Sequence, residues 1–218
     1  EMTSSLVGSE MCIRDRISLT AFYKLIKNPI SRIEVASAGG YLSYENIADK
    51  ATVAGVEVEV RKNLFVRPLS SAANGMNKLS FGLNGSYIYT NAKMPLATVT
   101  TGSQLEGAAP WIANFDLSHN FTKGNHSFIN TLVFNYVSDK IYTIGTQGYQ
   151  DIIEQGMMML DFVSQAKLNK YVSLTLKARN LLNPSYKLSR KANESGEKVV
   201  LSDYKKGINI SLGVSCTF

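Results

Sequence analysis

The chain ends in GINISLGVSCTF, residues 207–218, and this segment has the clearest structural pattern in the sequence. Apolar and small polar residues alternate along it with a period of two, which predicts a β-strand. One face carries Ile208, Ile210, Leu212, Val214, Cys216 and Phe218, and the other carries Asn209, Ser211, Gly213, Ser215 and Thr217. A strand between lipid and water must alternate in this way, although a soluble strand can do so as well. The C-terminus therefore raises the question of a membrane β-barrel.

The composition of the 218 residues leaves a membrane barrel and a soluble β-rich domain open. The sequence contains no run of about eighteen apolar residues, so it has no candidate transmembrane helix. A transmembrane barrel hides its hydrophobicity in alternation, and its average composition therefore resembles that of a soluble protein. Eleven Tyr and nine Phe against one Trp fit the strands of either class.

The formal net charge is +6, and the basic residues are densest between Lys187 and Lys206. This segment is either a solvated loop or a basic loop that meets anionic lipopolysaccharide or an anionic ligand. No nucleic-acid-binding signature accompanies the charges, so we expect no nucleic-acid partner. The two cysteines, Cys12 and Cys216, lie far apart in different contexts and do not indicate a disulfide framework.

The first sixteen residues, EMTSSLVGSEMCIRDR, differ from the rest of the chain. They show no strand alternation and no signal-peptide architecture, and SLVGSEMCIRDR resembles a translated sequencing-adapter read. We expect residues 1–16 to be a non-native or disordered segment and residues 17–218 to form one barrel portion. The natural protein is then expected to begin far upstream.

From Ile17 onward the chain reads as eight strands separated by turn signals. They are expected at 17–27, 41–61 with a kink near Asp49, 78–91, 109–121, 126–142, 156–168, 171–188 and 199–218. Tight turns at 122–125 and 169–170 alternate with longer loops at 92–107, 143–155 and 191–198. Membrane barrels show this asymmetry of short periplasmic turns and long external loops. The connection expected at 62–77 does not fit, since it should be short.

No pattern of chemical groups in the sequence predicts an enzyme. Asp49, Glu57, Glu59 and Asp161 could suggest paired carboxylates, but they fall on faces expected to line a hydrated lumen. His119 and His126 lack further ligands at a spacing that would bind a metal. The run at 157–159 of three Met is expected to face lipid or fill packing gaps. We therefore expect no catalytic, cofactor or metal site, and the substrate-binding residues stay unidentified.

Four stretches, in order, resemble the C-terminal barrel of TonB-dependent outer-membrane receptors. They are YEN at 44–46 followed by VAGVEVEV at 53–60, LEGAAPWIAN at 105–114, NLLNPSY at 180–186, and the alternating last strand with its terminal Phe. Each is weak alone, but together they cover nearly all of residues 17–218. The chain departs from the family at Lys205-Lys206-Gly207, where Pro-Gly-Arg is usual.

The resemblance implies an all-β, antiparallel, up-and-down transmembrane barrel segment that forms an open curved sheet. It implies a bacterial outer-membrane location, with lipid around a barrel of twenty-two strands and a plug inside it. TonB would act through the plug region, which this chain lacks, to admit a scarce nutrient of the siderophore, cobalamin or glycan class. The polar face of the last strand should line the lumen, with Phe218 at the periplasmic rim.

Two other architectures stay open at this point. A complete eight-stranded outer-membrane barrel with a structural or adhesion role predicts that residues 17–27 pair with the final strand. A soluble carbohydrate-binding β-sandwich predicts that the apolar faces are buried against a second sheet. In contrast, part of a larger barrel predicts a curved sheet with two open edges.

Overall fold

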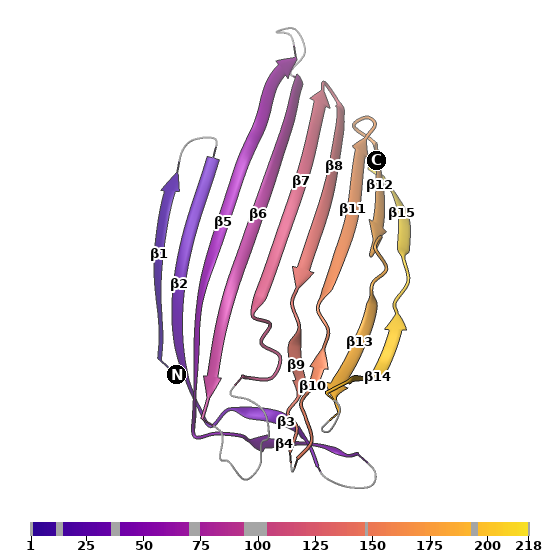
Figure 1. The fold of residues 1–218 in the computed structure, drawn as a ribbon. Helices are drawn as coiled ribbons and strands as arrows, with labels where there is room; N and C mark the ends of the chain where they lie inside the picture. Colours follow the sequence, from indigo (N-terminus) through magenta and orange to yellow (C-terminus); the bar gives the residue numbers. More distant parts are fainter. Residues whose placement is uncertain are drawn as a thin grey trace.

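The main feature of the computed structural model is one tall, curved antiparallel sheet (Figure 1). The structure describes residues 2–11, 15–35, 40–69, 75–93, 104–146, 148–192 and 196–217, giving only the backbone path for residues 2–11. Among these residues no helix is long and apolar enough to cross a membrane. The sheet order is β1-β2-β5-β6-β7-β8-β11-β12-β15, so neighbours in space follow the order of the chain. This confirms the predicted all-β, up-and-down architecture.

The strands of this sheet, which we call the wall, differ in length but are hydrogen-bonded in one continuous sheet. Their bounds are β1 Met2–Met11, β2 Asp15–Lys27, β5 Lys50–Leu69, β6 Gly75–Ala92, β7 Trp111–Lys123, β8 His126–Val137, β11 Met157–Lys167, β12 Val172–Arg179 and β15 Asn209–Cys216. Two-residue turns at Gly124-Asn125 and near Asn169-Lys170 join strands at one end of the wall, as predicted. We call this the turn end and the opposite end the loop end.

At the loop end the chain builds two smaller sheets. One has the order β14-β13-β10-β9, with β9 at Lys140–Thr143, β10 at Ile152–Glu154, β13 at Ser185–Lys191 and β14 at Lys198–Lys205. These strands extend β8, β11, β12 and β15 beyond a bend. At Asn180 (φ 59°) and Asn183 (φ 44°) the backbone is left-handed, which interrupts the ladder between β12 and β13. The other sheet is the hairpin of β3, Ile30–Glu34, and β4, Leu42–Asn46.

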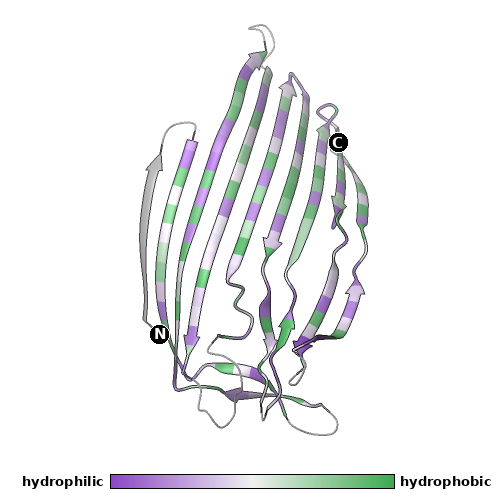
Figure 2. Ribbon diagram, in the orientation of Figure 1, coloured by the Kyte–Doolittle hydropathy of each residue, from purple (hydrophilic) through white to green (hydrophobic). Residues whose placement is uncertain are grey.

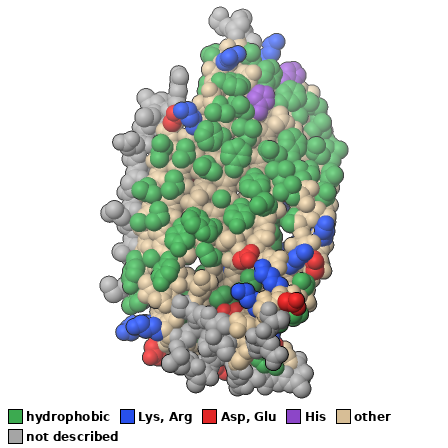
Figure 3. Space-filling model, viewed as in Figure 1, with side chains coloured by type: hydrophobic (Ala, Val, Ile, Leu, Met, Phe, Trp, Pro, Cys, Tyr) green, Lys and Arg blue, Asp and Glu red, His purple; other side chains and the backbone are tan. Residues whose placement is uncertain are grey.

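The register places apolar residues opposite apolar residues across the whole wall. Leu83, Phe115, Phe134 and Leu160 form one row across four strands, on what we call the apolar face. The next row, on the opposite side, holds Asn84, Asn114, Asn135 and Met159, and we call that side the polar face. Figure 2 shows the resulting stripes, and Figure 3 shows apolar side chains covering the face turned to the viewer. The sheet is therefore two-sided in the way the last strand predicts.

The buried core of the described residues is small and lies at the loop end. Ile33 of the β3–β4 hairpin packs with Ile141 and Ile144 and with Ala51 and Ala92 of the wall. Both alanines alternate with apolar-face positions and so point to the polar side of the sheet. The hairpin therefore folds inward, over the polar face, and a parallel bridge between Ile33 and Ile144 fixes it there.

Several predicted strand ends need correction. The segment 62–77 is not a long connection, because β5 continues to Leu69 and β6 begins at Gly75. Pro68 suggested a loop, but it pairs with Met76 at a point where β2 no longer flanks β5 among the described residues. Proline is tolerated on such a strand edge because its missing N–H faces no partner. The strand expected at 41–61 divides into β4 and β5 near Asp49, where the kink was predicted.

The expected strands at 126–142, 171–188 and 199–218 are each split into a wall part and a loop-end part. Residues 152–154, predicted to be loop, form β10. Residues 2–11 form β1, paired with β2, where the sequence predicted a non-native or disordered segment. That residues 1–16 do not belong to the natural protein stays a prediction. Cys12, residues 94–103 of the long loop and Phe218 lie outside the described residues.

The two rival architectures do not fit these pairings. Residues 17–27 pair with β1 and β5 and not with β15, so the described sheet does not close into a small barrel. The apolar face is not buried against a second sheet, since the side chains of Ile210, Leu212 and Val214 are 69%, 71% and 63% exposed. An open curved sheet with an exposed apolar face remains.

Candidate functional site

The polar face carries charged side chains that neutralise one another within a strand and between neighbouring strands. The Arg61 Nε donates to Glu59 Oε1 at 2.6 Å, and Arg16 lies 3.9 Å from the other Glu59 oxygen. Asp116, across the sheet, occupies the space over Gly82, where any Cβ would collide with its carboxyl group. Charges at alternate positions of a strand need water or each other, and this face supplies the partners.

Neutral polar pairs extend the same face across the sheet. Asn114 Nδ2 donates to Asn84 Oδ1 at 3.3 Å, and the Ser118 and Thr131 hydroxyl groups lie 3.1 Å apart. These groups stand half-buried on a curved wall, with no apolar layer packed over them among the described residues. They form a surface suited to a hydrated channel.

The four predicted carboxylates do not come together. Asp161 accepts a hydrogen bond at 2.8 Å from the Asn180 backbone N–H and so holds the start of the bend after β12. Glu59 is engaged with Arg61, and Glu57 shares its strand. Asp49 precedes β5, four strands from Asp161 in the sheet order. This placement gives no general acid–base pair among them.

The two histidines flank the turn after β7, as the sequence indicates. His119 Nε2 lies 2.9 Å from Asn77 Oδ1, a polar pair near the turn end of the apolar face. Ser164 donates to Asn130 Oδ1 at 2.7 Å in a second such pair. Among the described residues no three potential ligands form a metal-binding group. Both pairs satisfy polar groups where the apolar face meets the turns.

The three methionines divide between the two faces. Met158 pairs with Tyr136 on the apolar face and is 51% exposed, which agrees with the predicted lipid contact. Met157 and Met159 instead line a hollow of about 330 Å³ on the polar side, beside Arg179. No pattern in the sequence indicates this hollow, because it forms where the chain leaves the β12 ladder at Asn180.

The apolar face has the height of a bilayer. On β7 it runs from Trp111 to Phe121, ten residue steps or about 33 Å along the strand. At the usual tilt of barrel strands this is about 25 Å along the membrane normal, the height of the apolar band of outer-membrane barrels. Tyr87 and Trp111, with ring centroids 4.5 Å apart, mark its loop-end boundary as an aromatic girdle does.

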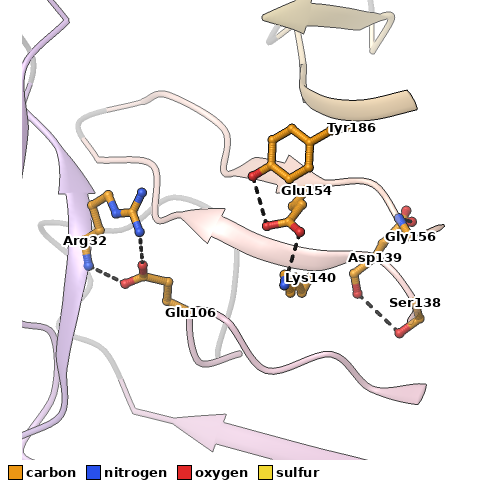
Figure 4. A network of polar contacts seen from close by, with 8 residues as sticks. All are labelled: Arg32, Glu106, Ser138, Asp139, Lys140, Glu154, Gly156 and Tyr186. Carbon is orange, nitrogen blue, oxygen red and sulfur yellow. Dashed lines mark hydrogen bonds and ion pairs between the residues drawn. The ribbon is translucent and has the colours of Figure 1, made fainter. Parts of the chain in front are cut away.

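An ion pair at the loop end fixes the β3–β4 hairpin to the loop before β7. Arg32 Nη2 lies 3.2 Å from Glu106 Oε1, and the Arg32 backbone N–H donates to the other Glu106 oxygen (Figure 4). The guanidinium also lies over the Tyr142 ring, 4.2 Å from its centroid. Burial alone lowers the pKa of Arg32, but Tyr142 and Glu106 raise that pKa above its ordinary value. Arg32 therefore remains a fixed cation.

A second contact group joins β9, β10 and β13. Lys140 Nζ lies 3.1 Å from Glu154 Oε1, and the Tyr186 hydroxyl donates to Glu154 Oε2 at 3.3 Å (Figure 4). Burial, followed by the negative charge of Glu154, raises the pKa of Tyr186 to about 12. The phenol is consequently a neutral donor at any physiological pH. Tyr186 closes the NLLNPSY motif, so the motif ends on a structural hydrogen bond.

A third contact group joins the hairpin to β13. Arg190 pairs with the Glu34 carboxylate, and the Thr146 hydroxyl donates to the Glu34 backbone carbonyl. The side chains of Arg190 and Glu34 are only 15% and 16% exposed. All three contact groups are formed by residues distant in sequence, which sequence patterns could not bring together. They connect the segments of the loop end to one another.

The comparisons with known proteins agree with this geometry. The family model described as "TonB dependent receptor-like, beta-barrel" matches residues 13–181, well over half of the chain. No curated protein and no solved structure matches the chain. The family consists of outer-membrane receptors and transporters and is not an enzyme family. This chain therefore belongs to the TonB-dependent receptor family and forms part of its outer-membrane β-barrel.

Proposed function

We propose that this chain forms the C-terminal wall of a receptor that takes up a scarce nutrient of the siderophore, cobalamin or glycan class. The observation that carries the proposal is the two-sided sheet, with a bilayer-high apolar face and a charged, internally paired polar face. Only a wall between lipid and a hydrated lumen needs both faces exposed.

In this proposal the turn end faces the periplasm and the loop end faces the outside. The apolar face contacts lipid, and strands inside the sheet pair their backbone groups with neighbours on both sides, as they must because lipid offers no partner. The exposed outer edge of β15 supports pairing with a further strand of the complete barrel. Residues 17–218 are the barrel portion, and residues 1–16 stand outside the natural receptor.

The loop end would shape the mouth of the lumen. The β3–β4 hairpin lies on the polar side and is held by the contacts of Arg32 with Glu106 and of Arg190 with Glu34. A hairpin held through β3 by both contacts narrows the entry instead of sweeping across it. TonB would act through a plug region on the inner side, and the wall would remain still while the plug rearranges.

Nutrient uptake in the native bacterium tests the proposal. Deletion of the full-length gene should abolish high-affinity uptake of a labelled ferric siderophore, cobalamin or oligosaccharide, and deletion of the TonB gene should abolish the same uptake. The complemented strain is the control. Unchanged uptake of all three classes in the receptor deletion would overturn the proposal.

A further inference from the structure

The hollow on the polar face contains two basic side chains without an acidic partner. It has a volume of about 330 Å³ and lies where the wall bends into the loop-end sheets, and Arg179 and Lys206 both line it. Both residues are exposed, and among the described residues neither forms an ion pair. The basic residues of the three loop-end contact groups, in contrast, each have a carboxylate partner.

The asparagines of the NLLNPSY motif build one side of this hollow. The Asn180 side-chain amide donates to the Gly207 carbonyl oxygen at 2.6 Å, and the Gly207 N–H donates to Asn183 Oδ1 at 3.1 Å. Gly207 has a left-handed backbone with φ 83°, which glycine adopts without strain. The motif thus fixes the segment between β14 and β15 against the bend after β12, and this segment carries Lys206.

Apolar side chains and one carboxylate complete the lining. Met157 and Met159 stand on the polar face of β11 and contribute their thioether side chains. The Tyr186 ring also lines the hollow, and Lys206 Nζ lies 5.9 Å from its centroid. Asp161 follows on the same face of β11, but its Oδ1 already accepts a backbone hydrogen bond. The hollow therefore offers two cations beside an apolar floor.

The charges of the hollow suit a ligand group with a single negative charge. Arg179 and Lys206 bring two positive charges and Asp161 brings one negative charge, so the lining carries one net positive charge. Lys177 adds to the positive potential, because it stands two residues before Arg179 on the same face of β12. An arginine guanidinium binds a carboxylate through paired, charge-assisted hydrogen bonds. A carboxylate would thus supply the partner that these cations lack.

The hollow lies close to the loop-end boundary of the apolar band, on the opposite side of the wall. Met157 is paired with Val137, which is paired with Ile112, the residue after Trp111 at that boundary. A molecule that enters the lumen from the loop end would reach this level first. The volume suits one end of a larger molecule, since sites for whole small ligands span about 300 to 1,000 Å³.

We propose that this hollow binds a carboxylate of the transported nutrient at the entrance of the lumen, and that the nutrient is therefore an acidic molecule. This inference rests on the uptake function proposed above and narrows its substrate. Acidic ferric chelates and uronic-acid glycans fit, whereas cobalamin and neutral glycans bear no carboxylate. Arg179 binds the carboxylate, Lys206 supplies the second positive charge, and the two methionines contact the carbon atoms beside it.

Calorimetric titration of the full-length receptor tests the charge of the ligand. The probes are ferric citrate and trigalacturonate, which bear carboxylates, and cyanocobalamin and maltotriose, which do not. One or both carboxylate probes should bind, and the two others should not. Binding of neither carboxylate probe would overturn the inference. The uptake proposal would survive that result if deletion of the gene still abolished uptake of a nutrient without a carboxylate.

Removal of the two cations tests the hollow itself. The double variant Arg179→Gln with Lys206→Gln should bind the carboxylate probe at least tenfold more weakly, and Arg179→Lys, which keeps the charge, should lose less. The matched control is Lys167→Gln with Lys170→Gln at the turn end, which makes the same change of charge and should bind as the wild type does. Heat-dependent gel mobility checks that each variant is folded. Equal affinity of the double variant and the wild type would overturn the proposal, as would equal losses in the double variant and its control.

A second variant keeps both cations and places a negative charge in the hollow. Met159→Glu should abolish binding of the carboxylate probe, because the new carboxylate would pair with the cations in its place. Gln165→Glu, on the same face of β11 nearer the turn end, makes the same change of charge and should bind normally. Normal binding by Met159→Glu would mean that the carboxylate binds elsewhere, and the proposal would fail.

Discussion

The wall and the loop end of this molecule are stabilised by different means. In the wall, residues from β2 to β15 are joined by continuous ladders, and large apolar side chains stay exposed on one face. At the loop end, short strands carry a small buried core and several ion pairs between distant segments. The apolar side chains of the wall therefore depend on the surrounding medium to remove them from water, whereas those of the loop-end core are buried by the protein itself.

This difference indicates where each kind of substitution acts. In the wall, a change matters according to the face it falls on, because one face meets lipid and the other water. At the loop end, a change matters according to the partner it removes, because an unpaired buried charge is costly. Between β12 and β13 the two regions meet at Asn180 and Asn183, whose left-handed backbone separates the wall ladder from the loop-end ladder.

The largest expected effect is a charge placed on the apolar face. Phe134→Arg should destabilise the receptor by about 2–4 kcal/mol, the cost of a cation near the bilayer midplane. The neighbouring variant Asn135→Arg points to the polar face and should cost far less. Urea unfolding of the receptor in lipid vesicles measures both. Equal losses for the two variants would mean that the faces are not divided between lipid and water.

The next effect tests the loop end through its most buried ion pair. Glu34→Gln leaves Arg190 without its countercharge and should cost about 1–3 kcal/mol locally, the penalty of an unsatisfied buried group. The expected result is faster proteolytic cleavage at the β3–β4 hairpin, with the wall intact on gels. Glu45→Gln, an exposed change on the same hairpin, is the control. Cleavage at the wild-type rate would contradict a fixed hairpin.

Two wall glycines offer a matched pair with a smaller expected effect. A Cβ at Gly55 would overlap the Phe22 ring and lie 2.8 Å from the Tyr87 carbonyl oxygen, whereas one at Gly85 would meet nothing. Gly55→Ala should therefore lower the unfolding free energy by about 1–2 kcal/mol through overpacking. Gly85→Ala should leave it nearly unchanged. The same urea titration compares them, and equal stability of the two variants would show that Phe22 does not cover Gly55.

The smallest effect concerns the phenol at the end of the NLLNPSY motif. Because its pKa is raised to about 12, the Tyr186 hydroxyl stabilises the fold below pH 10, and that contribution is lost as the pH rises through 12. Tyr186→Phe should cost about 1 kcal/mol or less at neutral pH. The difference in alkaline absorbance titration between wild type and variant isolates this phenol. A difference curve centred near pH 10 would contradict the burial of its hydroxyl.

The alternation of the sequence was sufficient to predict the wall. Period-two segments such as those around Phe115 and Leu212 place both faces correctly, because a strand's side chains have no other choice of side. The tight turn at Gly124-Asn125 was also predictable from the sequence. Strand ends are harder to predict. Pro68 suggests that β5 ends before it, but the strand continues because an edge position tolerates proline.

The loop end could not be predicted from local patterns. Arg32 and Glu106 are 74 residues apart, and Glu34 and Arg190 are 156 apart, so nothing near either residue signals its partner. The hollow beside Met157 and Met159 forms where the chain bends after β12, and Lys27 meets Lys50 only through the register of β2 on β5. The basic residues of 187–206 are dense in the sequence itself, whereas Lys27 and Lys50 are far apart along the chain and meet only in the sheet.

Cysteine accessibility along β7 tests whether the sheet separates lipid from a hydrated lumen. Single cysteines at positions 113 to 118 of the full-length receptor, with Cys216 replaced by Ser, would be treated in whole cells with a membrane-impermeant maleimide. Asn114, Asp116 and Ser118 positions should react, and Ala113, Phe115 and Leu117 positions should be protected by lipid. Reaction at all six positions, or the opposite alternation, would contradict a wall between lipid and a hydrated lumen.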